Sequence, residues 1–256
     1  MVRLMLSDEL WSKLWTIMRQ HGVYDKSNLR QTVEAILYRM RVGCPWRDLP
    51  PAFGNWNSIY RKFNYWSKNN KLMNIFNCLI IEPDFENKFV DGSFIKAHQH
   101  STGAAGTYHQ HIGKSKGGNT TKIHMSVDSN GMPLKFCLSA GNVNDSTVAT
   151  TIINDLTLTN NVVADKGYDS EKIREHINAL GSNPVIPRKI NSKIGNDKMD
   201  WGLYKLRHKV ENIFARLKHF RAIATRYDKL AINFKSMVAL ACAYIWLPKG
   251  ISSKAI

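Results

Sequence analysis

Acidic residues are scarce in this sequence. Its 256 residues include 20 Asp and Glu against 36 Lys and Arg, which gives a formal net charge of +16. Such an excess of positive charge is typical of proteins that bind nucleic acid or another anionic surface, although it does not specify a fold. A carboxylate that lies within a strongly basic segment therefore calls for an explanation.

Long apolar runs and paired cysteines are also missing. The longest apolar run, residues 237–247, is shorter than the roughly 18 residues that a membrane span requires, so a buried helix is expected there. The N-terminal segment is charged and lacks the apolar core of a signal peptide. The cysteines are scattered without a CxxC pair, which favours reduced core thiols. They are Cys44, Cys78, Cys137 and Cys242. We expect a cytoplasmic, nucleoid-associated protein with no membrane partner.

Residues 1–82 are predicted to form a helical domain. Ser7 can cap a helix that runs to about residue 19, and Asn28 can cap a second helix, which Gly43 would end. A third helix opens at Asn55 or Asn57, after a segment interrupted by prolines.

The third helix is basic and aromatic, and it carries Arg61 and Lys62. Two helices, a short break and such a helix are consistent with a helix-turn-helix that places its third helix in a DNA groove. An ordinary three-helix bundle with a basic rim is the alternative. The net charge favours the DNA-binding interpretation.

From residue 83 onward the apolar pattern becomes that of alternating strands and helices. Strands are expected at 88–96, 121–127, 133–138, 161–164 and 184–187, and helices at 144–156, 169–180, from about 203, and in a last segment that ends near 247. Three consecutive strands followed by helix–strand repeats predict an antiparallel meander continued by parallel strands. Residues 83–256 are therefore expected to form an α/β domain with a mixed sheet flanked by helices.

Two aspartates lie within or directly after predicted strands, where a binding site is expected. Asp91 lies in the middle of the first strand, and Asp165 follows the fourth. Binding sites gather at the carboxyl ends of parallel strands, so the two carboxylates would meet if these strands are neighbours. A buried carboxylate needs a partner, and oxygen ligands without thiolates favour Mg²⁺ or Mn²⁺ over zinc.

The segment 203–227 holds a single acid, Glu211, among many basic residues. A continuous helix there would place Tyr204, Arg207, Glu211 and Lys218 on one polar face, within about 60° of arc. Opposite them it would bury an apolar face of Leu206, Val210, Ile213, Leu217 and Phe220. A solvated pair between Arg207 and Glu211 is one interpretation. The other is that Glu211 binds a divalent cation beside a polyanion.

The tripeptide GKS at 113–115 resembles part of a phosphate-binding loop, but that motif needs a glycine at position 108, which is Tyr. ATP is therefore not expected as a ligand. Lys114 and Lys116 are better interpreted as contacts to the DNA backbone.

The motifs together resemble an insertion-sequence transposase of the IS5 family, and the resemblance covers nearly the whole chain. Its signature of Tyr, two residues, Arg, three residues, Glu, six residues and Lys is matched by Tyr204, Arg207, Glu211 and Lys218. Similar segments are GCPWRDLP (43–50), FGNWNSIYRKF (53–63), FVDGSFIKAH (89–98), GKSKGGNTTKIH (113–124), GNVNDST (141–147), VVADKGYDS (162–170) and FRAIATRYDKLA (220–231). Only 211 − 165 = 46 positions separate Asp165 from Glu211, too few for the domain that some DDE transposases carry there.

The resemblance implies an RNase H-like DDE domain, in which Asp91, Asp165 and Glu211 hold Mg²⁺ or Mn²⁺ and catalyse DNA strand cleavage and transfer. Tyr204, Arg207 and Lys218 are expected to support them. The resemblance also implies that the protein binds double-stranded DNA, both at terminal inverted repeats and at the target site. It would bind this DNA as a homo-oligomer. Residues expected to contact DNA are Arg61, Lys62, Lys114, Lys116, Lys122 and Arg216. A catalytically silent DNA-binding regulator derived from a transposase is the alternative.

Overall fold

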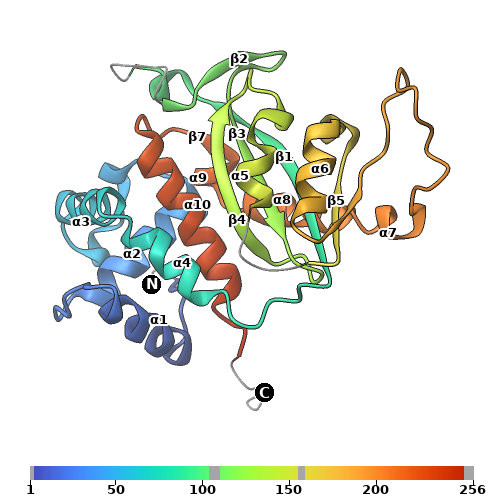
Figure 1. Ribbon diagram of the computed structural model, residues 1–256. Helices are drawn as coiled ribbons and strands as arrows, with labels where there is room; N and C mark the ends of the chain where they lie inside the picture. The colour runs from blue at the N-terminus through green and yellow to red at the C-terminus, as the bar shows by residue number, and fades with distance from the viewer. Residues whose placement is uncertain (1–2, 104–109, 155–158, 251–256) are drawn as a thin grey trace. The chain divides into compact units, whose positions relative to one another are not determined.

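The computed structural model describes residues 3–103, 110–154 and 159–250 (Figure 1). Contacts divide the chain into two compact units. The helical unit comprises Met1–Ile81, His98–Ala104 and Leu217–Ile256, and the sheet unit comprises Glu82–Ala97 and Ala105–Arg216. Within the described ranges, no helix is both long and apolar enough to cross a lipid bilayer.

The helical unit contains the helices that local signals predict and some that they do not. Its helices are α1 (Asp8–Gln20), α2 (Leu29–Val42), α3 (Trp56–Lys68), α4 (Lys71–Leu79), α9 (Arg221–Ala224) and α10 (Ala231–Trp246), with 3₁₀ turns at Trp46–Asp48, Pro51–Phe53 and Gln99–Ser101 and a short strand, β7 (Thr225–Arg226). Ser7 caps α1 by accepting from the backbone N–H of Leu10, and Asn55 caps α3 through Asn57 and Ser58. Gly43 ends α2 in the left-handed conformation, at φ 71°. These predicted boundaries are confirmed.

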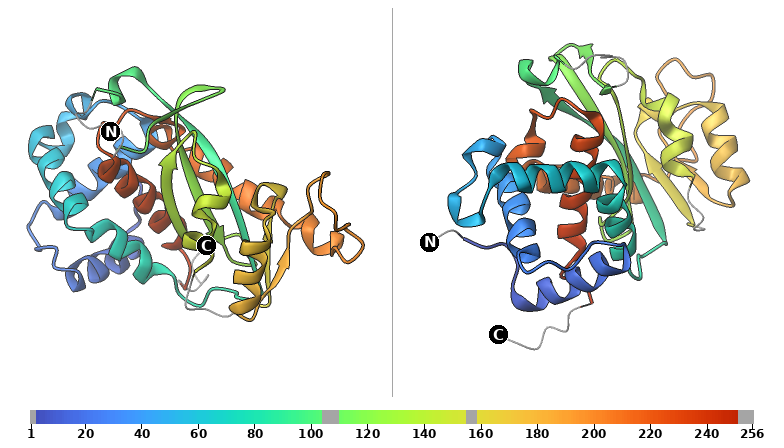
Figure 2. Two further views of the ribbon diagram at one scale, coloured as in Figure 1. Left: turned by 45° about the horizontal axis from the view of Figure 1, so that its top comes forward. Right: turned by 90° about the vertical axis from the view of Figure 1, so that its left-hand side faces the viewer.

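Helix α10 supplies the centre of the helical unit's core. It packs against α2, α3 and α4, beside which it lies in Figures 1 and 2. Leu240 of α10 lines an apolar cavity together with Leu14 of α1, Ile36 of α2, and Leu72 and Ile75 of α4. The buried apolar helix predicted to end near residue 247 is thereby confirmed.

The cysteines are free, but they are not all core thiols. Cys242 is buried in α10, whereas Cys78 is exposed with its Sγ 2.9 Å from Nε2 of His21. The prediction of a core position is therefore wrong for Cys78, because this residue lies on the solvent side of α4.

The sheet unit confirms the mixed sheet. Its elements are β1 (Asn87–Ala97), β2 (Gly113–Ser115), β3 (Gly118–Val127), β4 (Pro133–Ala140), α5 (Asp145–Ile153), β5 (Asn161–Ala164), a 3₁₀ turn (Lys166–Tyr168), α6 (Glu171–Ala179), β6 (Asn183–Val185), α7 (Trp201–Lys205) and α8 (His208–Lys218), whose last two residues belong to the helical unit. The strand order is β2-β3-β1-β5-β6, and β4 pairs with β3. The pairs β1–β3 and β3–β4 are antiparallel, whereas β1–β5 and β5–β6 are parallel. The end of the helix expected at 144–156 lies outside the described residues.

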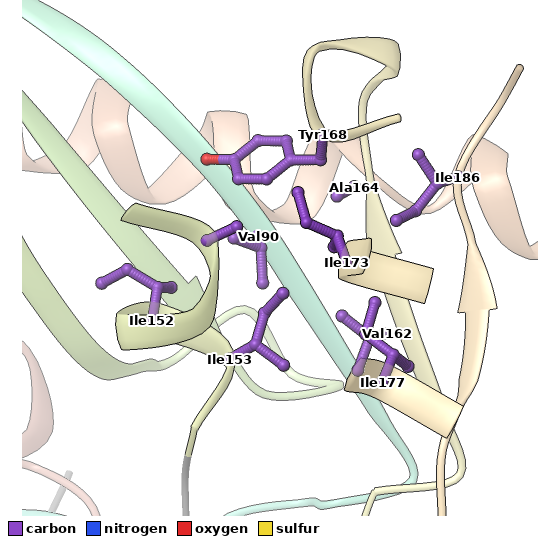
Figure 3. Packing of buried hydrophobic residues seen from close by; sticks show 10 residues of the cluster. Val90, Ile152, Ile153, Val162, Ala164, Tyr168, Ile173, Ile177 and Ile186 are labelled. Atoms are coloured by element: carbon purple, nitrogen blue, oxygen red, sulfur yellow. The ribbon is translucent and has the colours of Figure 1, made fainter. Parts of the chain in front are cut away.

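Helices cover both faces of this sheet. On one face, α5 and α6 bury an apolar cluster that includes Val90, Ile152, Val162 and Ile177 (Figure 3). Successive strand residues point to opposite faces, so Phe89 and Asp91 face away from Val90. On that second face the Lys209 ammonium of α8 lies 5.7 Å from the centre of the Phe89 ring. Asp91 therefore points to the side of the sheet where α8 lies.

Candidate active site at the carboxyl edge of the sheet

The parallel pairing of β1 and β5 brings the two predicted aspartates together. Val90 lies opposite Ala164 in the register, so the next residues, Asp91 and Asp165, are neighbours. Strand β5 ends at Ala164, and the Asp165 carboxylate then caps the 3₁₀ turn by accepting from the Gly167 N–H at 2.8 Å. The condition for the two carboxylates to meet, that these strands are neighbours, is fulfilled in the structure.

Asp91 is held in a partly buried position. Burial raises the pKa of its carboxyl group, and the nearby charge of Asp165 acts in the same direction. A hydrogen bond from the Gly92 N–H at 2.7 Å and the Arg207 guanidinium, whose Nη1 lies 2.8 Å from Oδ2, oppose this rise. The pKa of Asp91 stays above its ordinary value, so a positive partner is favourable here.

Arg207 connects Asp91 with Glu211. Its Nη1 donates to Asp91 and its Nη2 donates to Glu211 Oε1. Burial lowers the pKa of the guanidinium, but the charges of Asp91 and Glu211 outweigh that effect and raise it. Glu211 itself is about half exposed, with a side-chain exposure of 53%. The pair of the first interpretation is present, and Arg207 also reaches a strand aspartate. That Glu211 binds a divalent cation stays a prediction.

The continuous helix predicted from residue 203 is wrong. Helix α7 ends at Lys205 and α8 begins at His208, and the intervening turn is closed by bonds such as Arg207 N–H to Tyr204 O at 3.0 Å. Leu206 in this turn is 36% exposed, so it does not join the buried face that Val210 and Ile213 provide. Phe220 is buried but lies beyond α8, at the start of α9.

The three supporting residues lie on different elements. Tyr204 lies on α7, where its ring packs edge-on against Trp201 at 5.8 Å between centroids. Lys218 is exposed at the end of α8, two turns and about 10 Å beyond Glu211 along the helix. Within the described ranges, Arg207 is the one supporting residue of the three that forms a hydrogen bond with the predicted acids.

The donor set suits a hard divalent cation, but not all three acids are assembled. Asp91 and Asp165 offer neighbouring carboxylates, one of them destabilised by burial, and oxygen donors match Mg²⁺ or Mn²⁺. In the described ranges no three His, Cys, Asp or Glu side chains lie close enough together to share an ion. The Arg207 guanidinium stands between Asp91 and Glu211, which explains why the third acid is kept apart.

The predicted DNA contacts fall into two groups. Arg61, Lys114, Lys116 and Arg216 are exposed, as a contact to DNA requires. Two other lysines are already engaged. Lys62 donates to Asn28 Oδ1 at 3.0 Å and to Thr32 Oγ1 at 3.1 Å, and burial, aided by Lys26, lowers its pKa. Lys122 is buried in an ion pair with Asp145 at 2.5 Å. These placements give the DNA role of Lys62 and Lys122 no support, and it stays a prediction.

A buried ion cluster behind Asp91 escaped the sequence reasoning. Asp145 Oδ2 pairs with Lys122, and its Oδ1 lies 3.1 Å from Nδ1 of the fully buried His124. The two partners outweigh the effect of burial and hold the pKa of Asp145 below its ordinary value. Gly92 adjoins this cluster on the face of β1 opposite Asp91. The motif at 141–147 contains Asp145, but it gives no sign of the partners Lys122 and His124.

Comparison with known proteins agrees with this geometry. A family model described as "Transposase DDE domain" matches residues 86–246, which is more than half of the chain. The chain belongs to this DDE transposase family. A second model, described as "Putative transposase of IS4/5 family", matches residues 6–76. The resemblance noted in the sequence is thus confirmed at the level of the family.

Two relatives extend the comparison. The chain is 37% identical over 129 residues to a Brucella ovis protein described as "Putative transposase for insertion sequence element IS6501", a match that covers 50% of this chain and 98% of that relative. It is 33% identical over 136 residues to a Burkholderia cepacia protein described as "Putative transposase for insertion sequence element IS402", covering 49% of this chain and 62% of that relative. No solved structure matches the chain.

Proposed function

We propose that this DDE family member cleaves DNA at the ends of an insertion sequence and joins the freed strand to target DNA. The observation that carries the proposal is the pairing of Asp91 and Asp165 at the carboxyl end of β5, with Arg207 and Glu211 facing them. We also propose that the sheet is RNase H-like, with its three acids at the catalytic centre.

The surroundings of each residue suggest its role in the proposed reaction. Asp91 and Asp165 would hold Mg²⁺ or Mn²⁺, because burial of Asp91 disfavours its isolated charge. A divalent ion there would activate a water or a DNA 3′-hydroxyl and stabilise the leaving oxygen. The forked donors of Arg207 suit a phosphate as well as a carboxylate. A DNA phosphate that draws Arg207 away would release Glu211 to join the two aspartates.

The remaining expectations complete this proposal. Double-stranded DNA of the terminal inverted repeats would be read by residues 1–82, with Arg61 on α3 as a contact, and a homo-oligomer would bring two ends together. Lys218 would neutralise phosphate charge along α8, and Tyr204 would position the turn that carries Arg207. Binding by such ionic contacts should weaken steeply as salt concentration rises.

The test is cleavage of a duplex that carries the element's terminal repeat, in Mg²⁺ and in Mn²⁺. Asp91→Asn, Asp165→Asn and Glu211→Gln should each abolish cleavage while leaving DNA affinity within a few-fold of wild type. Glu175→Gln is the matched control, since Glu175 is an exposed acid on α6. Normal cleavage by one of the three variants removes that acid from the site. A wild-type protein that binds the repeat but cuts it with neither ion is the silent regulator instead.

A further inference from the structure

The segment 188–199 combines positive charge with exposed apolar side chains. Lys193 and Lys198 are exposed. Ile190 is fully exposed and Ile194 is 55% exposed. Large aliphatic side chains in water cost free energy, and their placement among lysines points to a ligand that has both anionic and apolar parts. We call this segment the basic loop.

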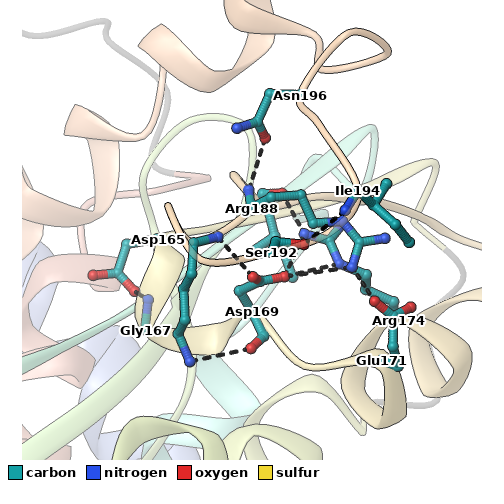
Figure 4. Close-up of polar contacts among 11 residues, drawn as sticks. Asp165, Gly167, Asp169, Glu171, Arg174, Arg188, Ser192, Ile194 and Asn196 are labelled. Atoms are coloured by element: carbon teal, nitrogen blue, oxygen red, sulfur yellow. Dashed lines mark hydrogen bonds and ion pairs between the residues drawn. The ribbon is translucent and has the colours of Figure 1, made fainter.

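The base of the basic loop is firmly anchored, as Figure 4 shows. The Arg188 N–H donates to Asn196 Oδ1 at 2.7 Å, which closes the loop on itself. The Lys189 N–H donates to Asp169 Oδ2 at 2.8 Å, and Arg174 donates to the other oxygen of that carboxylate at 2.8 Å. Asp169 is 7% exposed, so these charge-assisted bonds are sheltered from water. The loop tip is thus presented from a fixed base.

The anchor places the loop beside the proposed catalytic centre. Strand β6 runs parallel to β5, so both strands end at the edge where Asp165 lies. The loop leaves this edge after β6, is tied to Asp169 only four residues beyond Asp165, and leads into α7 and the Arg207 turn. The base of the loop therefore lies at the same edge of the sheet as the proposed catalytic centre, and DNA that extends from the acids along this edge would meet the loop.

We propose that the basic loop distorts the DNA duplex next to the cleaved bond, with Lys193 and Lys198 on phosphates and Ile190 inserted between base pairs. The inference rests on the proposed function, because it takes the position of DNA from the acids. Apolar side chains that enter a base step unstack it and kink the duplex, which opens the backbone to attack. DNA satisfies both features of the loop, since its phosphates match the lysines and its base faces match isoleucine.

The two isoleucines differ in a way that supplies a control. Ile194 lines a cavity of about 360 Å³ beneath the loop, together with Arg174 and Arg188, whereas Ile190 does not line it. Loss of the Ile194 side chain should weaken the packing beneath the loop. Loss of the Ile190 side chain should leave that packing intact and remove only the side chain that would insert between base pairs. Comparison of the two separates a wedge from a packing residue.

The first experiment measures distortion without cleavage, in full-length protein that carries Asp165→Asn. A terminal-repeat duplex with 2-aminopurine beside the cleaved bond should brighten on binding, because unstacking relieves quenching. Ile190→Ser should lose the signal, Ile190→Leu should keep it, and Ile194→Ala should keep at least part of it. On a duplex of unrelated sequence, Lys193→Ala and Lys198→Ala should each reduce the slope of log affinity against log salt by about 1.

The second experiment separates this inference from the proposed function. On a perfect duplex Ile190→Ser should cleave about tenfold or more slowly, since no inserted side chain would offset the cost of unstacking the step. A mismatch at that step should restore its rate but not that of Asp165→Asn. If 2-aminopurine does not brighten with the Asp165→Asn protein, or brightens equally when Ile190→Ser is added, the insertion of Ile190 between base pairs is overturned. If the wild type fails to cut while the fluorescence and salt slopes behave as expected, the proposed function falls and the loop's contact with DNA stands.

Discussion

Replacement of Gly92 by alanine tests the packing behind Asp91. A Cβ atom at this position of β1 would lie 2.6 Å from Lys122 Cε, 2.7 Å from Asp145 Oδ1 and 3.2 Å from His124 Nδ1. The lysine cannot simply swing away, because its ammonium is buried and bound to Asp145 at 2.5 Å. The added methyl group must therefore push apart a buried ion pair or displace the strand that carries Asp91.

The expected cost follows from these contacts. Forcing one extra methyl group into a packed site typically costs about 1–3 kcal/mol. Complete rupture of the pair between Lys122 and Asp145 would cost more, about 3–5 kcal/mol, because a buried charge would lose its partner. A strand shift of a few tenths of an ångström is the cheaper response, so we expect about 1–3 kcal/mol. That corresponds to a fall in melting temperature of about 2–4 °C for each kcal/mol in a protein of this size.

Thermal and urea unfolding of Gly92→Ala measures this cost. Gly117→Ala is the control, because the nearest atom to its new Cβ, Ser115 Oγ, is 3.8 Å away. In a background of Lys122→Ala, the effect of Gly92→Ala should shrink by at least about 0.5 kcal/mol, as expected for residues in contact. If Gly92→Ala melts with the wild type and the control, the close packing behind Asp91 is refuted.

Further predictions concern pH, DNA contacts and thiols. The lowered pKa of Asp145 means that its charge stabilises the fold above about pH 4 and that this contribution disappears as pH falls through the lower folded-state value. The stability gap between wild type and Asp145→Asn, from urea unfolding at a series of pH values, should therefore narrow in acid, and a constant gap would contradict the ion pair. Arg61→Ala should weaken DNA binding with little change in melting temperature. Lys62→Ala should instead lower the free energy of unfolding by about 1 kcal/mol, because its hydrogen bonds to Asn28 and Thr32 are lost. Binding isotherms and thermal melts that show the reverse would make Lys62 the DNA contact and Arg61 the structural residue. Cys78 should react with a thiol reagent in the native protein, while Cys242, whose pKa burial raises, should react only on unfolding; mass spectrometry of labelled peptides decides.

Local signals predicted much of the fold because the residues that begin or end a helix lie at its ends in the sequence. Ser7, Asn55 and Gly43 act within a few residues of themselves, so their roles can be read from the sequence. The strand pattern at 88–96 and the short apolar run at 161–164 likewise required no knowledge of distant residues. The neighbouring positions of Asp91 and Asp165 followed from the rule for parallel strands, once β1 and β5 were taken as adjacent.

What failed depends on contacts across long stretches of sequence. The helical pattern near Glu211 gives no sign that Arg207 is bonded to Asp91, 116 positions earlier, in a turn that divides two helices. In the same way Lys122 resembles any basic residue of a DNA-binding protein until Asp145 is brought beside it. A charged side chain has one appearance in sequence whether it faces solvent or a buried partner, so these assignments required the structure.

The contribution of α10 to the helical unit has a consequence for synthesis on the ribosome. Helix α4 ends at Leu79 and α10 ends at Trp246, which are 246 − 79 = 167 positions apart. At about 5–20 residues per second, translation takes roughly 8–33 s to supply the helix that covers Leu72 and Ile75. Throughout that interval the nascent helices expose the surface that Leu240 later buries. The first helices therefore cannot complete their core until α10 has been translated. A chaperone that shields apolar helices should bind the nascent chain until α10 emerges.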